Sequence, residues 1–219
     1  MNKRKKYLWV GLMGAIAAVC GQLAGGLSPA YDFTSPITVA FSSLRAVPLW
    51  RLGLCACLGS FGILLQYFGY QGIYLSFEDR ENKKGRLYHA ANFCFAPVGA
   101  LCHVLLCVFL CFYPAIMERS DGSELLLDFL LFFCLPLAVL FLVGAALVCL
   151  LMAIQIGGGH SSFSRWCILL NPLPVSLLIG TGLFFLPHSS LVNGLGFACT
   201  GLSSLLIFSV FLMANHQKH

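Results

Sequence analysis

The sequence predicts an all-α fold, an integral membrane bundle of six transmembrane helices that forms a single domain over residues 1–219. Three observations lead to this prediction. The chain is 59% hydrophobic and 10% charged, with a mean hydropathy of +0.87, whereas a soluble domain carries about 25% charged residues. The apolar residues form runs long enough to cross a bilayer. The basic residues gather beside these runs, which is the pattern of membrane orientation and excludes a nucleic-acid partner.

The six expected spans follow in order and are separated by polar or proline-containing segments. They cover residues 7–27, 50–77, 88–113, 125–156, 166–186 and 191–214. The first follows a basic start that resembles a signal peptide. Its apolar core is longer than the roughly 7–15 residues of a signal peptide, so we expect an uncleaved span. Small residues share one face of the first and second spans, which favours close helix packing.

The remaining segments have distinct expected roles. Residues 28–49 contain three prolines and are expected to connect the first two spans, either on the membrane surface or folded partly back over the bundle. Residues 78–86, EDRENKKGR, must lie in water. Pro97 is expected to kink the third span. The fourth run exceeds the bilayer's thickness, which tilt or a surface-lying start would absorb. The fifth span contains the sequence NPLP at 171–174, which begins or bends a helix, or frees carbonyls for a ligand.

Positive charge predicts the orientation. An N-terminus inside the cell places ten basic residues on the inner side: Lys3, Arg4, Lys5, Lys6, Arg80, Lys83, Lys84, Arg86, Arg165 and Lys218. The outer side then holds only Arg45, Arg51 and Arg119. Because basic residues favour the cytoplasmic side, we expect both termini in the cytoplasm and the protein integral to the cytoplasmic (plasma) membrane of a bacterial cell.

The third span is expected to organise the bundle, because a polar stripe runs along an otherwise apolar helix. At about 100° per residue, His89, Asn92 and His103 share a sector with small residues. Hydrocarbon cannot satisfy such a stripe, so it should face other helices or a cavity. His103 lies near the middle of the span, where an ionisable group indicates a functional site. The alternative is a neutral imidazole that shares a hydrogen bond with a neighbouring helix. The candidates for lining an interhelical pocket are His103, Asn92, His89, Gln66, Asn171 and Gln22.

A second group of polar residues is expected near the outer surface. Its candidates are Arg51, Asp128, Asn193 and Asp32. An ion pair between Arg51 and Asp128 would form if their helices touch. Two roles remain open for this group: a structural or headgroup contact, and recognition of a substrate carboxylate or phosphate.

No catalytic or cofactor pattern is visible in the sequence. All eleven cysteines lie in or beside apolar runs, where Cys acts as a small hydrophobe, and the pair Cys55 and Cys57 points to different helix faces. His89 and His103 have the spacing of haem ligands, but no facing helix carries a matching pair. Nucleotide-binding and protease motifs are missing. We therefore expect no cofactor, no metal and no catalytic residue.

The short basic N-terminus, WRLG at 50–53 and NP at 171–172 resemble uncharacterised bacterial membrane proteins of about six spans, of the domain-of-unknown-function type. The resemblance covers the whole chain and implies no activity. The residues favour a non-enzymatic protein that binds or conducts a small molecule or lipid through a polar interhelical pocket. Its expected partners are the bilayer and that ligand; the oligomeric state is not written in the sequence. Two alternatives remain open: an intramembrane enzyme or redox protein using His103, and a structural or accessory membrane subunit.

Overall fold

The protein is all-helical in the residues that the structure, a computed structural model, describes: 2–27, 47–119, 121–187 and 189–214. The α-helices are α1 (Lys3–Gly26), α3 (Leu49–Tyr74), α4 (Lys83–Met117), α5 (Gly122–Phe129), α6 (Leu135–Gly157), α7 (Pro172–Phe184), α8 (Ser190–Phe197) and α9 (Cys199–Ala214). A π-helical turn, Leu130–Cys134, joins α5 to α6, and a 3-10 helix, Arg165–Leu170, precedes α7. The predicted all-α class is therefore confirmed.

Several of these helices can cross a bilayer. Four stretches are long and apolar enough: α1, α3, α4 and the joined α5–α6 stretch Gly122–Gly157. Helices α8 and α9 pass the same test together, but the chain bends by 64° between them. They raise the total to five if they form one broken span. A protein with this many apolar helices is a membrane protein.

The last two expected spans are each interrupted. Within residues 166–186, a 3-10 helix ends at Leu170 and α7 begins at Pro172. Proline fits the first turn of a helix, where its missing N–H leaves no bond unmade, so it starts α7 there. Within residues 191–214, the break falls at Ala198, just after two glycines of α8 that weaken its last turn. By contrast, α4 continues through both Pro97 and Pro114.

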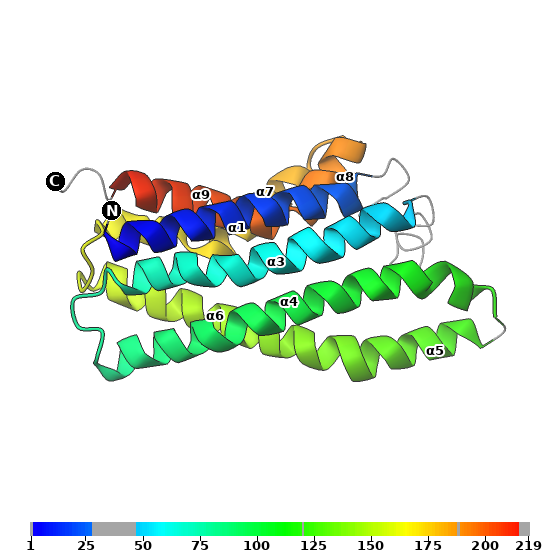
Figure 1. Cartoon of the computed structure of the whole chain (residues 1–219), viewed down its shortest axis with the longest axis horizontal. Coiled ribbons are helices and arrows are strands. Elements are labelled where there is room, and N and C mark those ends of the chain that lie inside the picture. Colours follow the sequence, from blue (N-terminus) through cyan, green and yellow to red (C-terminus); the bar gives the residue numbers. More distant parts are fainter. Residues whose placement is uncertain (1, 28–46, 120, 188, 215–219) are drawn as a thin grey trace.

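The helices run roughly along the long axis of one elongated bundle (Figure 1). Helix α1 packs against α3 on one side and against α8 and α9 on the other, while α4 packs against α3 and α6. Helix α7 packs mainly against α9. Glycines allow the closest of these contacts: a Cβ on Gly62 of α3 would lie 2.5 Å from both the nitrogen of Ala18 and the carbonyl oxygen of Gly14 in α1.

The loop between α3 and α4 and the loop after α6 meet at the end of the bundle where α1 begins and α9 ends (Figure 1). The Glu78 N–H donates to the His160 carbonyl oxygen at 2.9 Å, and Phe77 forms a β-bridge with Ser161. The guanidinium of Arg4 donates to Ser162 Oγ at 2.5 Å and lies over the ring of Phe163. The first two contacts join the loops to each other, and the contacts of Arg4 tie the start of α1 to the loop after α6.

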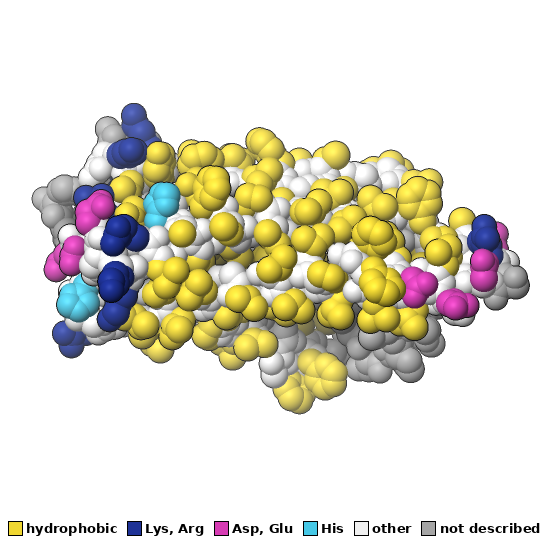
Figure 2. All heavy atoms as spheres, turned by 90° about the horizontal axis from the view of Figure 1, so that it is seen from below, with side chains coloured by type: hydrophobic (Ala, Val, Ile, Leu, Met, Phe, Trp, Pro, Cys, Tyr) yellow, Lys and Arg dark blue, Asp and Glu magenta, His cyan; other side chains and the backbone are white. Residues whose placement is uncertain are grey.

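Basic side chains concentrate at this same end, as Figure 2 shows. Among the described residues, nine belong to it: Lys3, Arg4, Lys5, Lys6, Arg80, Lys83, Lys84, Arg86 and Arg165. The opposite end holds Arg51, at the start of α3, and Arg119, whose exposed side chain pairs with Asp121 at 3.0 Å. The guanidinium of Arg119 lowers the pKa of the Asp121 carboxyl below its usual value. The bundle thus has one strongly basic end.

Candidate functional site

Two neighbouring cavities lie inside the bundle and share one lining residue, Gln22 of α1. The first cavity has a volume of about 150 Å³ and is enclosed by α1, α3, α4, α6, α7 and α9. The lining is mostly apolar and includes Phe95 and Phe141, whose rings stack with centroids 5.0 Å apart. The polar residues of the lining, called the polar wall below, are Gln22, Gln66, Tyr70, Ser176, Thr200, Ser203 and Ser204.

Hydrogen bonds link several members of the polar wall. Ser176 of α7 donates to Ser203 Oγ at 2.8 Å, and Ser203 donates to the carbonyl oxygen of Thr200 at 2.8 Å. The Tyr70 and Ser204 hydroxyls share a separate bond at 3.4 Å. These bonds join α7 and α3 to α9.

Gln22 is the least satisfied member of the wall. Its amide nitrogen donates to Thr200 Oγ1 at 3.3 Å, whereas its buried carbonyl oxygen, Oε1, has no hydrogen-bond partner among the described residues. Gly201 makes room for it, because a Cβ there would lie 2.7 Å from Oε1. A buried acceptor without a donor costs about 1–3 kcal/mol, so a ligand that donates a hydrogen bond would gain from it.

The first cavity reaches the outer surface of the bundle beside α6. Leu142 lines the cavity and is nevertheless 57% exposed. Apolar side chains around the bundle face hydrocarbon in a membrane protein. A molecule dissolved in the bilayer can therefore approach the cavity sideways, without crossing an aqueous phase.

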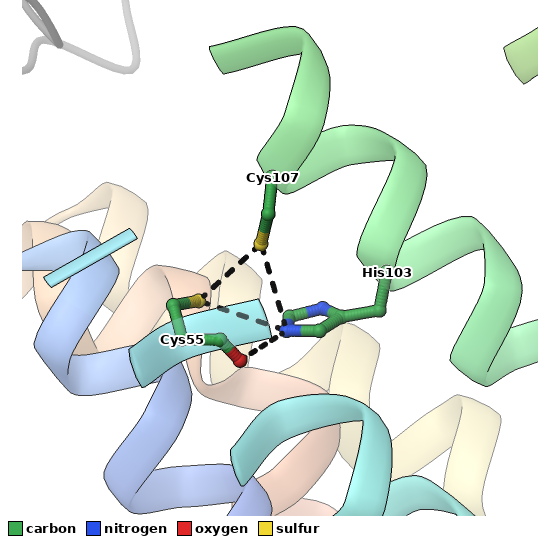
Figure 3. A group of neighbouring side chains, drawn as sticks. All are labelled: Cys55, His103 and Cys107. Atoms are coloured by element: carbon green, nitrogen blue, oxygen red, sulfur yellow. Dashed lines mark hydrogen bonds between the residues drawn. The ribbon is translucent and has the colours of Figure 1, made fainter. Parts of the chain in front are cut away.

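The second cavity, of about 180 Å³, contains a cluster of two thiols and one imidazole (Figure 3). Cys55 lies on α3, and His103 and Cys107 lie one turn apart on α4. The Cys55 Sγ is 3.6 Å from His103 Nε2 and 3.7 Å from Cys107 Sγ, and Cys107 Sγ is 4.0 Å from the same nitrogen. His103 Nε2 also lies 3.1 Å from the Cys55 carbonyl oxygen. Cysteine and histidine in such proximity are the usual ligands of soft metal ions.

Two glycines bring this cluster together. A Cβ on Gly59, one turn after Cys55 in α3, would lie 2.0 Å from His103 Nε2. A Cβ on Gly25 of α1 would lie 2.9 Å from Cys55 Sγ. Real side chains do not approach so closely, so the imidazole and the thiol occupy spaces that only glycine leaves open.

The family comparison covers almost the entire chain. Residues 1–218 match the model of DUF6796, described as a family of unknown function. The chain belongs to this family. The predicted resemblance to proteins of the domain-of-unknown-function type is thereby confirmed. No curated protein and no solved structure matches the chain.

The structure places three of the six expected pocket residues at the cavities and three away from them. His103, Gln66 and Gln22 line the cavities. Asn92 and Asn171 are buried elsewhere, and their amides donate to the carbonyl oxygens of Tyr67 and Cys149 at 3.2 and 2.7 Å. His89 is exposed, and its ring packs against that of Tyr74 with the centroids 5.1 Å apart.

The expected outer cluster does not include an ion pair between Arg51 and Asp128. Arg51 instead donates from Nε to the Ala24 carbonyl oxygen at 2.7 Å and from Nη2 to that of Leu27 at 2.6 Å, at the end of α1. Asp128 is exposed on α5, which packs against α4 and not against α3. Asn193 is buried in α8, and Asp32 lies outside the described residues. Arg51 thus caps the end of α1. The last carbonyl groups of a helix have no partners within the helix, so they accept hydrogen bonds from a nearby guanidinium.

Sequence reasoning missed the two thiols and the hydroxyl groups of the first cavity. Two of the three residues of the cluster have a readable signal, because His103 and Cys107 stand four residues apart and share a helix face. Cys55 has none, since its partners come from another helix. The hydroxyls of Ser176, Ser203 and Ser204 also look like ordinary helix-packing residues in the sequence.

Proposed function

We propose that the protein crosses the cytoplasmic membrane six times, with both termini inside, and binds a small, mostly apolar molecule in the first cavity. The topology is supported by the basic end of the bundle, where α1 begins and α9 ends, because positive charge favours the cytoplasmic side. In this arrangement the 3-10 helix and α7 together make the fifth pass, and α8 and α9 make the sixth.

The observation that carries the proposed binding is the lining of the first cavity, which is mostly apolar and contains a few polar groups. A cavity of about 150 Å³ with apolar walls can hold a benzene-sized group. The stacked rings of Phe95 and Phe141 offer such a group an apolar surface. The polar wall offers hydroxyl groups and the carbonyl oxygen of Gln22. This combination favours a ring-sized molecule that carries one hydrogen-bond donor.

The bilayer is the proposed source of this ligand. The exposed rim residue Leu142 places the cavity mouth beside hydrocarbon, where an amphipathic ring compound would be concentrated. A preformed cavity also distinguishes this function from that of an accessory subunit, whose polar side chains would only hold helices together.

Fluorine NMR of fluorophenol, added to the full chain in lipid nanodiscs, tests the proposal. Fluorophenol supplies a ring and one hydroxyl donor, so we expect a saturable bound resonance besides the signal of probe dissolved in lipid. Fluorobenzene lacks the donor and should bind about fivefold more weakly, because a hydrogen bond contributes about 1 kcal/mol. Replacing Gln22→Met, which removes the acceptor, should abolish this difference.

Two variants of α6 form the matched pair for this experiment. Ala145 is buried and lines the cavity, so Ala145→Phe should fill it and remove the bound resonance. Ala146 is exposed, and Ala146→Phe should leave binding unchanged. Equal binding by both variants, or no saturable binding by the unaltered protein, would refute a ligand site in this cavity.

A further inference from the structure

We propose that Cys55, His103 and Cys107 form a site for one zinc-class divalent cation, bound by both sulfurs and the imidazole Nε2. This site lies in the second cavity and is independent of the ligand proposed for the first cavity. Nothing in the sequence pattern or in the family description assigns it.

The distances between the three side-chain atoms already fit a tetrahedral ion. Zinc bonds of about 2.3 Å to sulfur and about 2.0 Å to nitrogen place two sulfurs about 3.8 Å apart and a sulfur and a nitrogen about 3.5 Å apart. The observed separations are 3.7 Å between the sulfurs, and 3.6 and 4.0 Å between a sulfur and Nε2. An ion can therefore enter the cluster with shifts of about half an ångström.

Charge balance favours a divalent cation at this depth. Two thiolates and one neutral imidazole carry a charge of −2, so a divalent ion makes the complex neutral, whereas a monovalent ion leaves a negative charge in an apolar environment. Cys55 and Cys107 are buried, and α3 and α4 are both membrane-spanning candidates. Thiolate and imidazole also select the softer metals over magnesium and calcium, which prefer oxygen.

Binding requires a defined movement of protons. Each thiol releases one proton to solvent when its sulfur bonds to the ion. The imidazole must present a bare Nε2, so its proton resides on Nδ1 and any hydrogen bond from Nε2 to the Cys55 carbonyl oxygen is lost. The net reaction exchanges two protons for one divalent cation, with no change of oxidation state.

The cavity leaves one coordination position open. Three protein ligands account for three corners of the tetrahedron, and the cavity of about 180 Å³ adjoining them has room for water. Gln22 lines this cavity as well and supplies a polar wall for a water ligand. Structural zinc sites are closed by four protein ligands, so this geometry is that of an exchangeable or reactive site.

Cobalt loading of the reduced full chain in detergent tests the site. Cobalt reports on tetrahedral thiolate ligation through its charge-transfer and d–d absorption bands, and zinc should displace it and bleach them. We expect one cobalt per chain. Cys55→Ser, Cys107→Ser and His103→Gln should each weaken binding at least tenfold, since loss of a mere supporting contact to a ligand already costs about 10–100-fold.

Neighbouring cysteines provide the controls. Cys57→Ser on α3 and Cys111→Ser on α4 remove a thiol near the cluster but outside it, and should leave the spectrum unchanged. Gly59→Ala keeps all three ligands but displaces the imidazole, so it should also weaken binding. Elution volume and thermal unfolding without metal identify variants that fold.

Three results would overturn the site. The first is a cobalt spectrum that persists in a protein carrying both Cys55→Ser and Cys107→Ser. The second is a spectrum lost equally with Cys57→Ser, which would indicate metal held by other thiols. The third is a reduced, folded protein that takes up no cobalt but forms a Cys55–Cys107 disulfide on mild oxidation, which would indicate a redox pair. Failure of fluorophenol binding, in contrast, leaves these readouts unaffected.

Discussion

Arg51 joins two helices at the end of the bundle that carries few basic residues. The last turn of α1 contains no basic residue of its own, and Arg51 of α3 donates to two of its terminal carbonyl groups. Hydrogen bonds from a charged donor contribute about 1.5–3 kcal/mol each, more than neutral ones. The guanidinium also complements the negative end of the α1 dipole.

Replacing Arg51→Met is therefore expected to lower the free energy of unfolding by about 1.5–3 kcal/mol, measured by denaturant titration in detergent. Arg51→Lys should recover only part of this loss, because an ammonium group cannot serve both carbonyls with a fixed fork. Arg119→Gln is the control: its ion pair with Asp121 is exposed, so its loss should change the free energy of unfolding much less. Equal effects at Arg51 and Arg119 would contradict the capping role.

At the scale of residues, the sequence identified polar side chains that line cavities better than it identified the groups that these side chains contact. The sequence marked His103, Gln22 and Gln66 because polar groups in apolar helices must find partners, and all three line cavities. An ion pair of Arg51 with Asp128 was expected only if their helices touch; Arg51 instead donates to backbone carbonyl groups, which are not visible as candidates in any sequence. Cys55 was overlooked for the related reason that its significance depends on which helix faces it.

At the scale of elements, the contact between α1 and α3 depends on glycine. Gly62 faces the backbone of α1, whereas Gly53, nine residues earlier in the same helix, has no atom within 4 Å of where its Cβ would be. Gly62→Ala should therefore destabilise the protein by about 1–3 kcal/mol through overpacking. Gly53→Ala should stabilise it by up to about 1 kcal/mol, because alanine is the better helix former.

Denaturant titration of both variants in the same detergent distinguishes packing from helix propensity. Opposite signs support the close approach of the two helices. Stabilisation by both substitutions would mean that the face of Gly62 is open, and the packing of α1 on α3 would then be wrong.

Sequence periodicity predicted the long helices and failed at the short ones. Helices α1, α3 and α4 lie in uninterrupted apolar runs, which hydropathy alone identifies. The interruption at Asn171 and the bend between α8 and α9 arise from Pro172 and from two glycines, whose effect depends on local packing. Pro97 and Pro114 show the converse, since α4 accommodates both. Proline thus begins one helix and remains inside another.

At the scale of the whole molecule, the distribution of charge leads to a test of orientation. Glu81 lies in the loop at the basic end, and Ser123 lies at the start of α5 at the other end; both are exposed. We would introduce one cysteine at a time at these positions, in a protein whose exposed Cys20, Cys57 and Cys94 are changed to serine. The two introduced cysteines should differ in labelling by an impermeant maleimide on intact cells. Ser123→Cys should react and Glu81→Cys should not.

Lysed cells provide the control for this labelling, because both cysteines should then react. Labelling of Glu81→Cys in intact cells, with Ser123→Cys protected, would reverse the orientation. Labelling of both would indicate that the two ends lie on the same side of the membrane, which is incompatible with α4 as a transmembrane helix.

Helix α7 by itself is shorter than the hydrocarbon core of a bilayer. Its 13 residues rise by about 20 Å, whereas a hydrocarbon core measures about 30 Å. Its side chains Leu177 and Leu178 are nevertheless among the most exposed apolar groups of the protein. A bilayer meets a short apolar surface by compressing, at a cost of a fraction of a kcal/mol for each ångström of hydrophobic mismatch. In the proposed topology the 3-10 helix before α7 lengthens this pass, and lipids with short acyl chains would reduce the cost of the remaining mismatch around α7, beside the mouth of the first cavity.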